Sequence, residues 1–352
     1  MIEFYNREKE IQEIMNILNM RPDLITFVYG PINSGKTELM SYLIKTLSKE
    51  FRVFYINLRG IYVERSEDFL KVLFEVDDKE YDLKEYFRML MDHLPSKLEL
   101  PFVGGIPVPK NLFKRFFEGK EVENVFKYVE RLFLKLKERF NPVLIIDELQ
   151  VIGDLKVDEL LIYKLFNLFI RLTKELHCCH VFAVTSDSLF IERVYSEAML
   201  QGRCRYLLVD DFDYETTKDF LKRYGFSEEE IQLAWEYFGG KPVYLVEAIK
   251  NKHRLRDICE ELLKIRVGQI EEIVFRLEVE DKELFKGVME LFKEVREKGE
   301  VRYRFVTDTI SFLVRNNILF ADPTAKTVKP QSKLDLLAIR NILEDFEETS
   351  KT

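Results

Sequence analysis

The chain has 352 residues, of which 47% are hydrophobic, so its length and composition allow two or three folded domains with buried cores. The formal net charge of −8 at pH 7 excludes a protein that coats nucleic acid indiscriminately, and is compatible with a local basic site. No apolar run is long enough to span a membrane, and the N-terminal segment MIEFYNREKEIQEIM is charged where a signal peptide needs apolar residues. We therefore expect a cytoplasmic protein that does not enter a membrane.

The cysteines raise the question of a metal site. Cys178 and Cys179 lie between His177 and His180, and the segment runs directly into an apolar strand pattern. Because neighbouring side chains of a strand point to opposite faces, these four groups would not converge on one ion. We expect all four cysteines to pack as small apolar residues in a reducing compartment: Cys178, Cys179, Cys204 and Cys259.

The beginning of the chain predicts a helix followed by a strand–loop–helix–strand unit. Apolar residues recur at helical spacing in the first segment, and the strands are short apolar runs rich in β-branched and aromatic residues. This order is typical of the βαβ unit of a parallel sheet. The predicted elements are a helix at 8–20, a strand at 23–29, a helix at 36–51 and a strand at 52–58.

Residues 66–140 are helical by pattern, with one interruption at 95–110. Four prolines and two glycines in LPSKLELPFVGGIPVPK argue against regular structure there. Long loops inside a domain often carry function, and this one is apolar. We keep two interpretations: a loop packed on its own domain, or an element that contacts a partner or gates a site.

Three further strands follow, in NPVLIIDELQ (141–150), in HVFAVTSDS (180–188) and within LQGRCRYLLVDDF (200–212), with a helix at about 157–176 and a short helix before the last strand. The five strands alternate with helices along the chain. This alternation predicts an α/β fold in which a parallel five-stranded sheet is covered by helices on both faces.

From Tyr214 onward the pattern is almost purely helical until about residue 300, and a short strand, a helix and a two-stranded segment with a turn at Asp322–Pro323 then precede a last helix. Helices followed by a two-stranded wing are the order expected of a winged helix. We predict three domains: an α/β domain at 1–212, a helical lid at 213–264 and a winged-helix domain at 265–352.

The sequence GPINSGKT, residues 30–37, fits the pattern GxxxxGK[ST] between a predicted strand and a predicted helix. Backbone N–H groups of such a loop point at phosphate oxygens, and the helix N-terminus adds a positive end. Lys36 is expected to reach the β- and γ-phosphates, and the Thr37 hydroxyl to ligate Mg²⁺. The predicted nucleotide-binding residues are Gly30, Pro31, Ile32, Asn33, Ser34, Gly35, Lys36, Thr37 and Glu38.

Asp147 and Glu148 end the strand in VLIIDELQ. An acid at the end of a neighbouring strand completes a magnesium site, so Asp147 is the second predicted Mg²⁺ ligand. Glu148 is the candidate base that activates or orients the attacking water. The alternative is that the two charges merely end a strand. Together with the phosphate loop, the two carboxylates favour hydrolysis over nucleotide binding alone.

Two weaker signals concern the γ-phosphate. Thr185 or Ser186 in AVTSDS ends the following strand, where a hydroxyl can sense the γ-phosphate or the water, although Ser and Thr also cap helices. Arg203 and Arg205 in QGRCRY can supply positive charge to the transition state, in cis or across a subunit boundary. For Arg205 a solvated surface position is an equal interpretation.

The motifs FYNREKEI, GPINSGKT, LIIDELQ, TSDS, GRCRY and FGGKP occur in an order that resembles the archaeal ATPases of the STAND group (MNS clade), within the AAA+-like P-loop NTPases. The resemblance covers about residues 1–250. It implies the core strand order 5-1-4-3-2, a helical lid, a C-terminal winged helix and ATP or ADP as the nucleotide.

The resemblance also implies roles for single residues. Asn6 and Arg7 look like residues of the segment near the adenine, and Pro242 is similar to the proline of the Gly-x-Pro lid motif. Arg203 becomes a phosphate-facing candidate. This lid has no clear arginine at the sensor position, although Lys241 is nearby, so a nucleotide-operated switch fits better than ring-type mechanical coupling.

The segment 301–340 is locally basic, with seven Lys or Arg against three Asp. A basic wing can contact DNA phosphates, but Asp308 would oppose DNA, and winged helices also dock proteins. Two hypotheses follow: an ATP-hydrolysing switch that works with DNA or with DNA-processing or other partner proteins, and a signalling or scaffold module that holds nucleotide with negligible turnover and docks protein partners.

Overall fold

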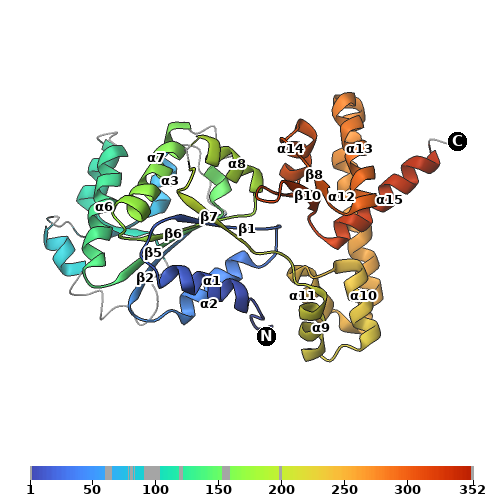
Figure 1. Cartoon of the computed structure of the whole chain (residues 1–352), viewed down its shortest axis with the longest axis horizontal. Helices are drawn as coiled ribbons and strands as arrows, with labels where there is room; N and C mark the ends of the chain where they lie inside the picture. The colour runs from blue at the N-terminus through green and yellow to red at the C-terminus, as the bar shows by residue number, and fades with distance from the viewer. Residues whose placement is uncertain are drawn as a thin grey trace.

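The structure is a computed structural model, and it describes residues 2–59, 66–77, 79, 82, 84–90, 104–118, 122–152, 159–197 and 200–349. An α/β part built around a five-stranded sheet lies beside a helical part that carries a three-stranded sheet (Figure 1). Within the described ranges, none of the helices is both long enough and apolar enough to cross a membrane.

The large sheet has five strands, all parallel, in the order β2-β5-β6-β1-β7. If these five strands are counted along the chain, the order reads 5-1-4-3-2 from the β7 edge, which confirms the predicted order and the predicted α/β fold. The strands are β1 (Ile25–Tyr29), β2 (Phe51–Asn57), β5 (Asn141–Asp147), β6 (His180–Thr185) and β7 (Cys204–Leu208).

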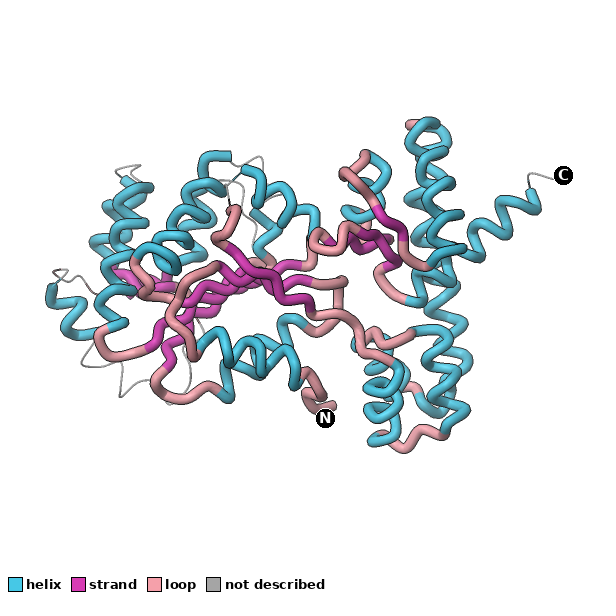
Figure 2. Tube along the Cα trace, in the orientation of Figure 1, coloured by secondary structure: helices cyan, strands magenta, loops and turns pink. Residues whose placement is uncertain are grey.

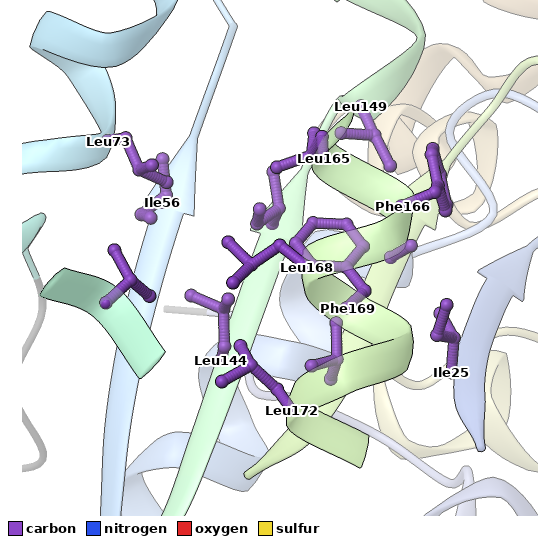
Figure 3. Packing of buried hydrophobic residues seen from close by; sticks show 14 of the residues in the cluster. Ile25, Ile56, Leu73, Leu144, Leu149, Leu165, Phe166, Leu168, Phe169 and Leu172 are labelled. Atoms are coloured by element: carbon purple, nitrogen blue, oxygen red, sulfur yellow. The ribbon is translucent and has the colours of Figure 1, made fainter. Parts of the chain in front are cut away.

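Helices cover both faces of this sheet (Figures 1 and 2). Side chains alternate along each strand, so Ile25, Phe27 and Tyr29 of β1 pack into one core cluster and Val28 into the other. Figure 3 shows the first cluster, where α7 packs on the strands through Leu165, Phe166 and Phe169. The covering helices are α1 (Glu8–Leu18) and α2 (Lys36–Thr46) on one face, and α3 (Ser66–Leu73), α6 (Val122–Lys137), α7 (Glu159–Ile170) and α8 (Ser188–Glu197) on the other.

The region 66–140 departs from the helical prediction. Strands β3 (Phe74–Asp77) and β4 (Ile106–Pro109) form a two-stranded parallel sheet, and α5 (Lys110–Glu118) follows. The predicted absence of regular structure at 95–110 is therefore wrong for β4. Proline is tolerated at a sheet edge, and Ile106 and Val108 bury alternate side chains there. Residues 95–103 lie outside the described residues.

The cysteines pack as predicted. Cys178, Cys179 and Cys259 are buried in hydrophobic clusters, and Cys204 packs against the core while partly buried. Burial raises the pKa of the Cys178 thiol to about 12, which suits an inert core residue.

The remainder of the chain forms helices around a three-stranded sheet with the order β8-β10-β9. Its strands are antiparallel neighbours, and its helices pack on them and on one another (Figure 1). The elements are α9 (Tyr214–Arg223), α10 (Glu228–Phe238), α11 (Pro242–Lys250), α12 (Leu255–Glu280), α13 (Lys282–Lys298), β8 (Val301–Arg302), α14 (Asp308–Arg315), β9 (Leu319–Asp322), β10 (Thr327–Pro330) and α15 (Lys333–Thr349).

Helix α12 belongs to two hydrophobic cores. Leu255 and Cys259 in its first half pack with α9, α10 and α11, whereas Ile270 and Val274 in its second half pack with α13, α14 and α15. The boundary expected at residue 264 therefore falls inside one continuous helix of 26 residues. The lid and the C-terminal part share this helix.

Candidate nucleotide-binding site

The glycine-containing loop connects the carboxyl end of β1 to the first residue of α2. At Gly30 a side chain is impossible, because a Cβ would lie 2.1 Å from the backbone oxygen of Val209. At Gly35 there is open space, but its φ of 93° strains any residue with a side chain. The two glycines thus serve close packing and backbone geometry, and together they place Lys36 at the helix start.

Lys36 is a buried cation in this loop. Its Nζ donates hydrogen bonds to the backbone oxygens of Gly30 at 3.0 Å and Pro31 at 2.8 Å, and the residue is 5% exposed. Burial, and secondarily the charge of Lys241, lowers the pKa of Lys36 to about 7. A phosphate group bound at the loop would supply the negative charge that restores the ordinary pKa.

The two predicted magnesium ligands are in contact. The Thr37 hydroxyl donates to Asp147 Oδ2 at 2.8 Å, and the Tyr55 hydroxyl donates to the same oxygen at 2.7 Å. A hydroxyl and a carboxylate beside a phosphate cradle are the oxygen ligands that Mg²⁺ prefers. The buried Ser34 Oγ has no hydrogen-bond partner among the described residues, as expected of a cradle built for a ligand. The residues present therefore fit Mg²⁺-nucleotide.

Glu148 follows Asp147 with a φ of 59°, a left-handed backbone that turns its side chain away from the strand direction. Its carboxylate pairs with Arg59 and accepts a hydrogen bond from Gln150 Nε2. Thr185 Oγ1 in turn donates to Gln150 Oε1 at 2.8 Å. Thr185 is thus linked to Glu148 through Gln150, a connection that the sequence analysis did not anticipate.

Asn6 and Arg7 lie at the seam between the loop and the lid. Arg7 is 5% exposed, and it donates from Nη2 to the backbone oxygen of Ser34 at 2.7 Å. Its guanidinium carbon is 4.6 Å from the centre of the Phe212 ring. Asn6 Nδ2 is 3.4 Å from the Thr216 hydroxyl on α9. The structure therefore brings Arg7 to the phosphate loop and Asn6 to helix α9.

Pro242 is the first residue of α11, and the contact with the loop comes from its neighbour Lys241. Lys241 is 2% exposed, and its Nζ donates to the backbone oxygen of Ile32 at 3.0 Å and pairs with Asp211 at 2.9 Å. The lid therefore contacts the third residue of the phosphate loop through a buried lysine.

Arg203 is not brought to the site, which corrects the phosphate-facing role in cis. It directly precedes β7, and its backbone oxygen accepts from the N–H of Ile25, the first residue of β1. The phosphate loop begins after Tyr29, the last residue of β1. A five-residue strand spans about 16 Å, so Arg203 lies at the amino ends of the strands, opposite to the end that carries the phosphate loop. Arg205 pairs with Asp23 at those same amino ends.

The C-terminal part contributes a residue that sequence reasoning missed. Gln331 Oε1 accepts a hydrogen bond from the N–H of Ile32 at 3.0 Å. The two residues are 299 positions apart, so no local pattern signals their contact. Tyr55 and Arg59 were missed for a related reason, since Tyr55 lies in β2 and Arg59 just after it, in an ordinary strand pattern.

This fold and this site define an ATP-binding, ATPase-type P-loop domain. Residues 4–248 match the family described as an ATPase domain predominantly from Archaea, and the chain belongs to that family. Residues 256–343 match the C-terminal domain of proteins similar to the uncharacterized ATP-binding protein MJ1010.

Relatives with similar sequences match nearly the whole chain. The uncharacterized ATP-binding protein MJ1659 of Methanocaldococcus jannaschii is 47% identical over 356 residues, which cover 98% of this chain and 99% of that protein. The uncharacterized ATP-binding protein PYRAB09480 of Pyrococcus abyssi is 49% identical over 347 residues, which cover 98% of this chain and 100% of that protein. The Walker-type ATPase PABY2304 of P. abyssi has a similar fold, with a TM-score of 0.62, 17% identity and 96% of each chain covered.

Proposed function

We propose that the protein is a Mg²⁺-dependent ATPase that hydrolyses ATP and uses the bound nucleotide to set its conformation. The observation that carries this proposal is the contact of Thr37 with Asp147 at the start of α2, with Lys36 and Glu148 beside them. A binding site without hydrolysis has no need of a second carboxylate at that position.

Each residue has a role in this proposal. Lys36 neutralises the terminal phosphates, and Arg7 and Lys241 hold the loop through its backbone oxygens. Thr37 and Asp147 would hold Mg²⁺, which neutralises charge that develops on the phosphate oxygens. Glu148 accepts a proton from the attacking water or orients it, and Gln150 fixes the carboxylate.

The test compares ATP hydrolysis by the wild type and by Glu148→Gln. We expect the amide to lower turnover at least about 100-fold, because it cannot take a proton, while ATP binding stays. Glu138→Gln, on an exposed turn, is the matched control. Absence of measurable Mg²⁺-dependent turnover in the wild type would rule out the hydrolytic role.

The second candidate is a signalling or scaffold module that binds nucleotide and hardly turns it over. The ion pair of Glu148 with Arg59 favours it, because a carboxylate bound to a guanidinium is less available to an attacking water. Tight ATP binding together with no turnover, in the wild type and in Arg59→Ala, is the outcome that this candidate requires.

We propose that the C-terminal part is a winged helix that docks DNA or protein partners, in line with the resemblance to the STAND group. The order α13, β8, α14, β9, β10 supports this assignment. Lys326 and Lys329 form ion pairs with Glu192 and Asp210 of the ATPase domain, so their charges already have partners within the molecule. The exposed Arg302 and Arg304, next to the 70% exposed Phe305, are the residues with which we test the DNA hypothesis.

A further inference from the structure

The backbone of Ile32 is bound on both sides of its Cα by parts of the molecule that follow the ATPase core in the chain. Its carbonyl oxygen accepts from Lys241 of the lid, and its N–H donates to Gln331 of the C-terminal part. Ile32 is the third residue of the phosphate loop. Both distal parts therefore contact the loop at the same residue, through its two flanking peptide groups.

Gln331 is built into this position. It is 3% exposed, its Nε2 donates to the backbone oxygen of Leu319 at 3.0 Å, and its backbone N–H donates to the oxygen of Ile318 at 3.1 Å. The side-chain amide is thus fixed by the start of β9, and its oxygen is aimed at the loop. A glutamine held in this way is not a solvated surface residue.

The hairpin formed by β9 and β10, residues 319–330, directly precedes Gln331. It contacts the ATPase domain at the carboxyl ends of the strands of the large sheet, where the phosphate loop lies. Tyr29, which ends β1, donates from its hydroxyl to Asp322 Oδ1 at 3.1 Å. Phe320 is 1% exposed and packs into the core cluster of the ATPase domain. Lys329 pairs with Asp210, just beyond β7. The contact is therefore continuous around the loop.

We propose that Gln331 is a residue of the nucleotide site, which competes with the terminal phosphate of ATP for the N–H of Ile32, so that ATP binding releases the β9–β10 hairpin from the ATPase domain. The inference rests on the proposed function, because it needs a nucleotide at the loop. One N–H cannot serve a neutral amide oxygen and a phosphate oxygen equally well, and the charged acceptor forms the stronger bond. By linkage, a ligand that displaces Gln331 is itself bound more tightly when Gln331 is absent.

Two substitutions separate this role from a merely structural one. Gln331→Leu removes the competing oxygen, so ATPγS should bind about fivefold more tightly, the effect of one typical hydrogen bond. Gln331→Glu keeps an acceptor for the Ile32 N–H and adds a negative charge, so ATPγS should bind more weakly. A loss of folding would weaken binding in both. Gln269→Leu, on the exposed side of α12, is the matched control.

The experiment measures ATPγS affinity with Mg²⁺ and, in parallel, amide hydrogen exchange of residues 319–330 in the full chain. In the wild type, ATPγS should speed exchange in this hairpin, and in Gln331→Leu the exchange should already be fast without ATPγS. If ATPγS binds but neither affinity nor exchange responds to Gln331, the inference is wrong and nucleotide binding stands. If neither the wild type nor Gln331→Leu binds ATPγS, both proposals fail.

Discussion

Lys36 illustrates how a single residue is set up for a ligand at the expense of the fold. The burial that lowers its pKa to about 7 disfavours its charged form in the folded protein. A side chain placed for function in this way is a usual source of conflict between activity and stability.

We predict that Lys36→Met abolishes ATP binding and also makes the protein more stable. The substitution removes a buried cation, so the free energy of unfolding should rise by at least about 1 kcal/mol near pH 7. Thermal unfolding with and without ATP measures both effects. Lys45→Met on the exposed side of α2 is the control, and it should change neither. A destabilised Lys36→Met would contradict the argument.

His180 gives a pH-dependent prediction away from the site. It is 5% exposed, and burial lowers its pKa to about 4 from an ordinary value of 6.5. Between these values the unfolded chain binds more protons than the folded one, so the free energy of unfolding rises with pH across this window. The stability that the folded protein has with His180 neutral is complete above about pH 6.5, and it is lost as the pH falls towards 4.

Replacing His180 with Asn should therefore reduce the rise in the free energy of unfolding between pH 4 and 6.5 by up to about 3 kcal/mol. Chemical denaturation at a series of pH values measures it, and His253→Asn, at an exposed position, is the comparison. An unchanged pH slope in His180→Asn would show that other groups cause the acid sensitivity.

The sequence predicted the residues of this site only where the signal is local. Lys36 and Thr37 lie in one short motif, and Asp147 ends an unmistakable apolar strand, so strand and motif together place them. Gln331 and Tyr55 reach the site through tertiary packing, which no short pattern records. Arg203 was misplaced because its motif precedes its strand, and a parallel sheet presents its ligand site at the other end.

At the scale of elements, the long regular segments and the short strands near the end of the chain were predicted, and β3 and β4 were not. The helices of the lid and the five core strands have strong periodicity, whereas β3 and β4 have four residues each, and β4 contains two prolines. Such strands are stable only because Ile106 and Val108 are buried by neighbouring elements. The boundary expected at residue 264 falls inside α12, where a continuous helical segment gives no break that a sequence pattern could mark.

Gly268 in the middle of α12 allows a direct test of this shared helix. A Cβ at this position would meet nothing within 4 Å, so Gly268→Ala should stabilise the protein by about 1 kcal/mol through helix propensity. Gly240→Ala is the opposite control, because its Cβ would lie 1.7 Å from the backbone oxygen of Phe212. Thermal unfolding of both variants checks the prediction, and a destabilised Gly268→Ala would argue against a regular helix there.

The whole molecule combines two sets of basic residues with different surroundings. Lys326 and Lys329 bind carboxylates of the ATPase domain, and Arg302 and Arg304 are exposed beside Phe305. The sequence alone could not separate the two sets, because all four lie within thirty residues of one another. The docked hairpin shows that Lys326 and Lys329 pair with carboxylates of the same molecule, whereas Arg302 and Arg304 are exposed to solvent.

We predict that the double change Arg302→Glu and Arg304→Glu weakens binding to duplex DNA at least about tenfold and lowers its salt dependence, if DNA is the partner. Lys326→Ala with Lys329→Ala should leave DNA binding nearly unchanged and loosen the hairpin instead. Gel shifts at several salt concentrations measure both. Equal affinity of the wild type and the double Arg variant would leave protein docking as the role of this surface.

The two-core membership of α12 has a mechanical consequence. A helix of 26 residues is about 39 Å long, so a tilt of about 10° at its lid end would carry its far end through roughly 7 Å. Lys241 and Gln331 bind the backbone oxygen and the N–H of Ile32, and the parts of the molecule that carry them share α12. A shift of a few ångström at the phosphate loop, caused by the presence of one phosphate group, would then become a displacement of the far end of α12 large enough for another molecule to detect.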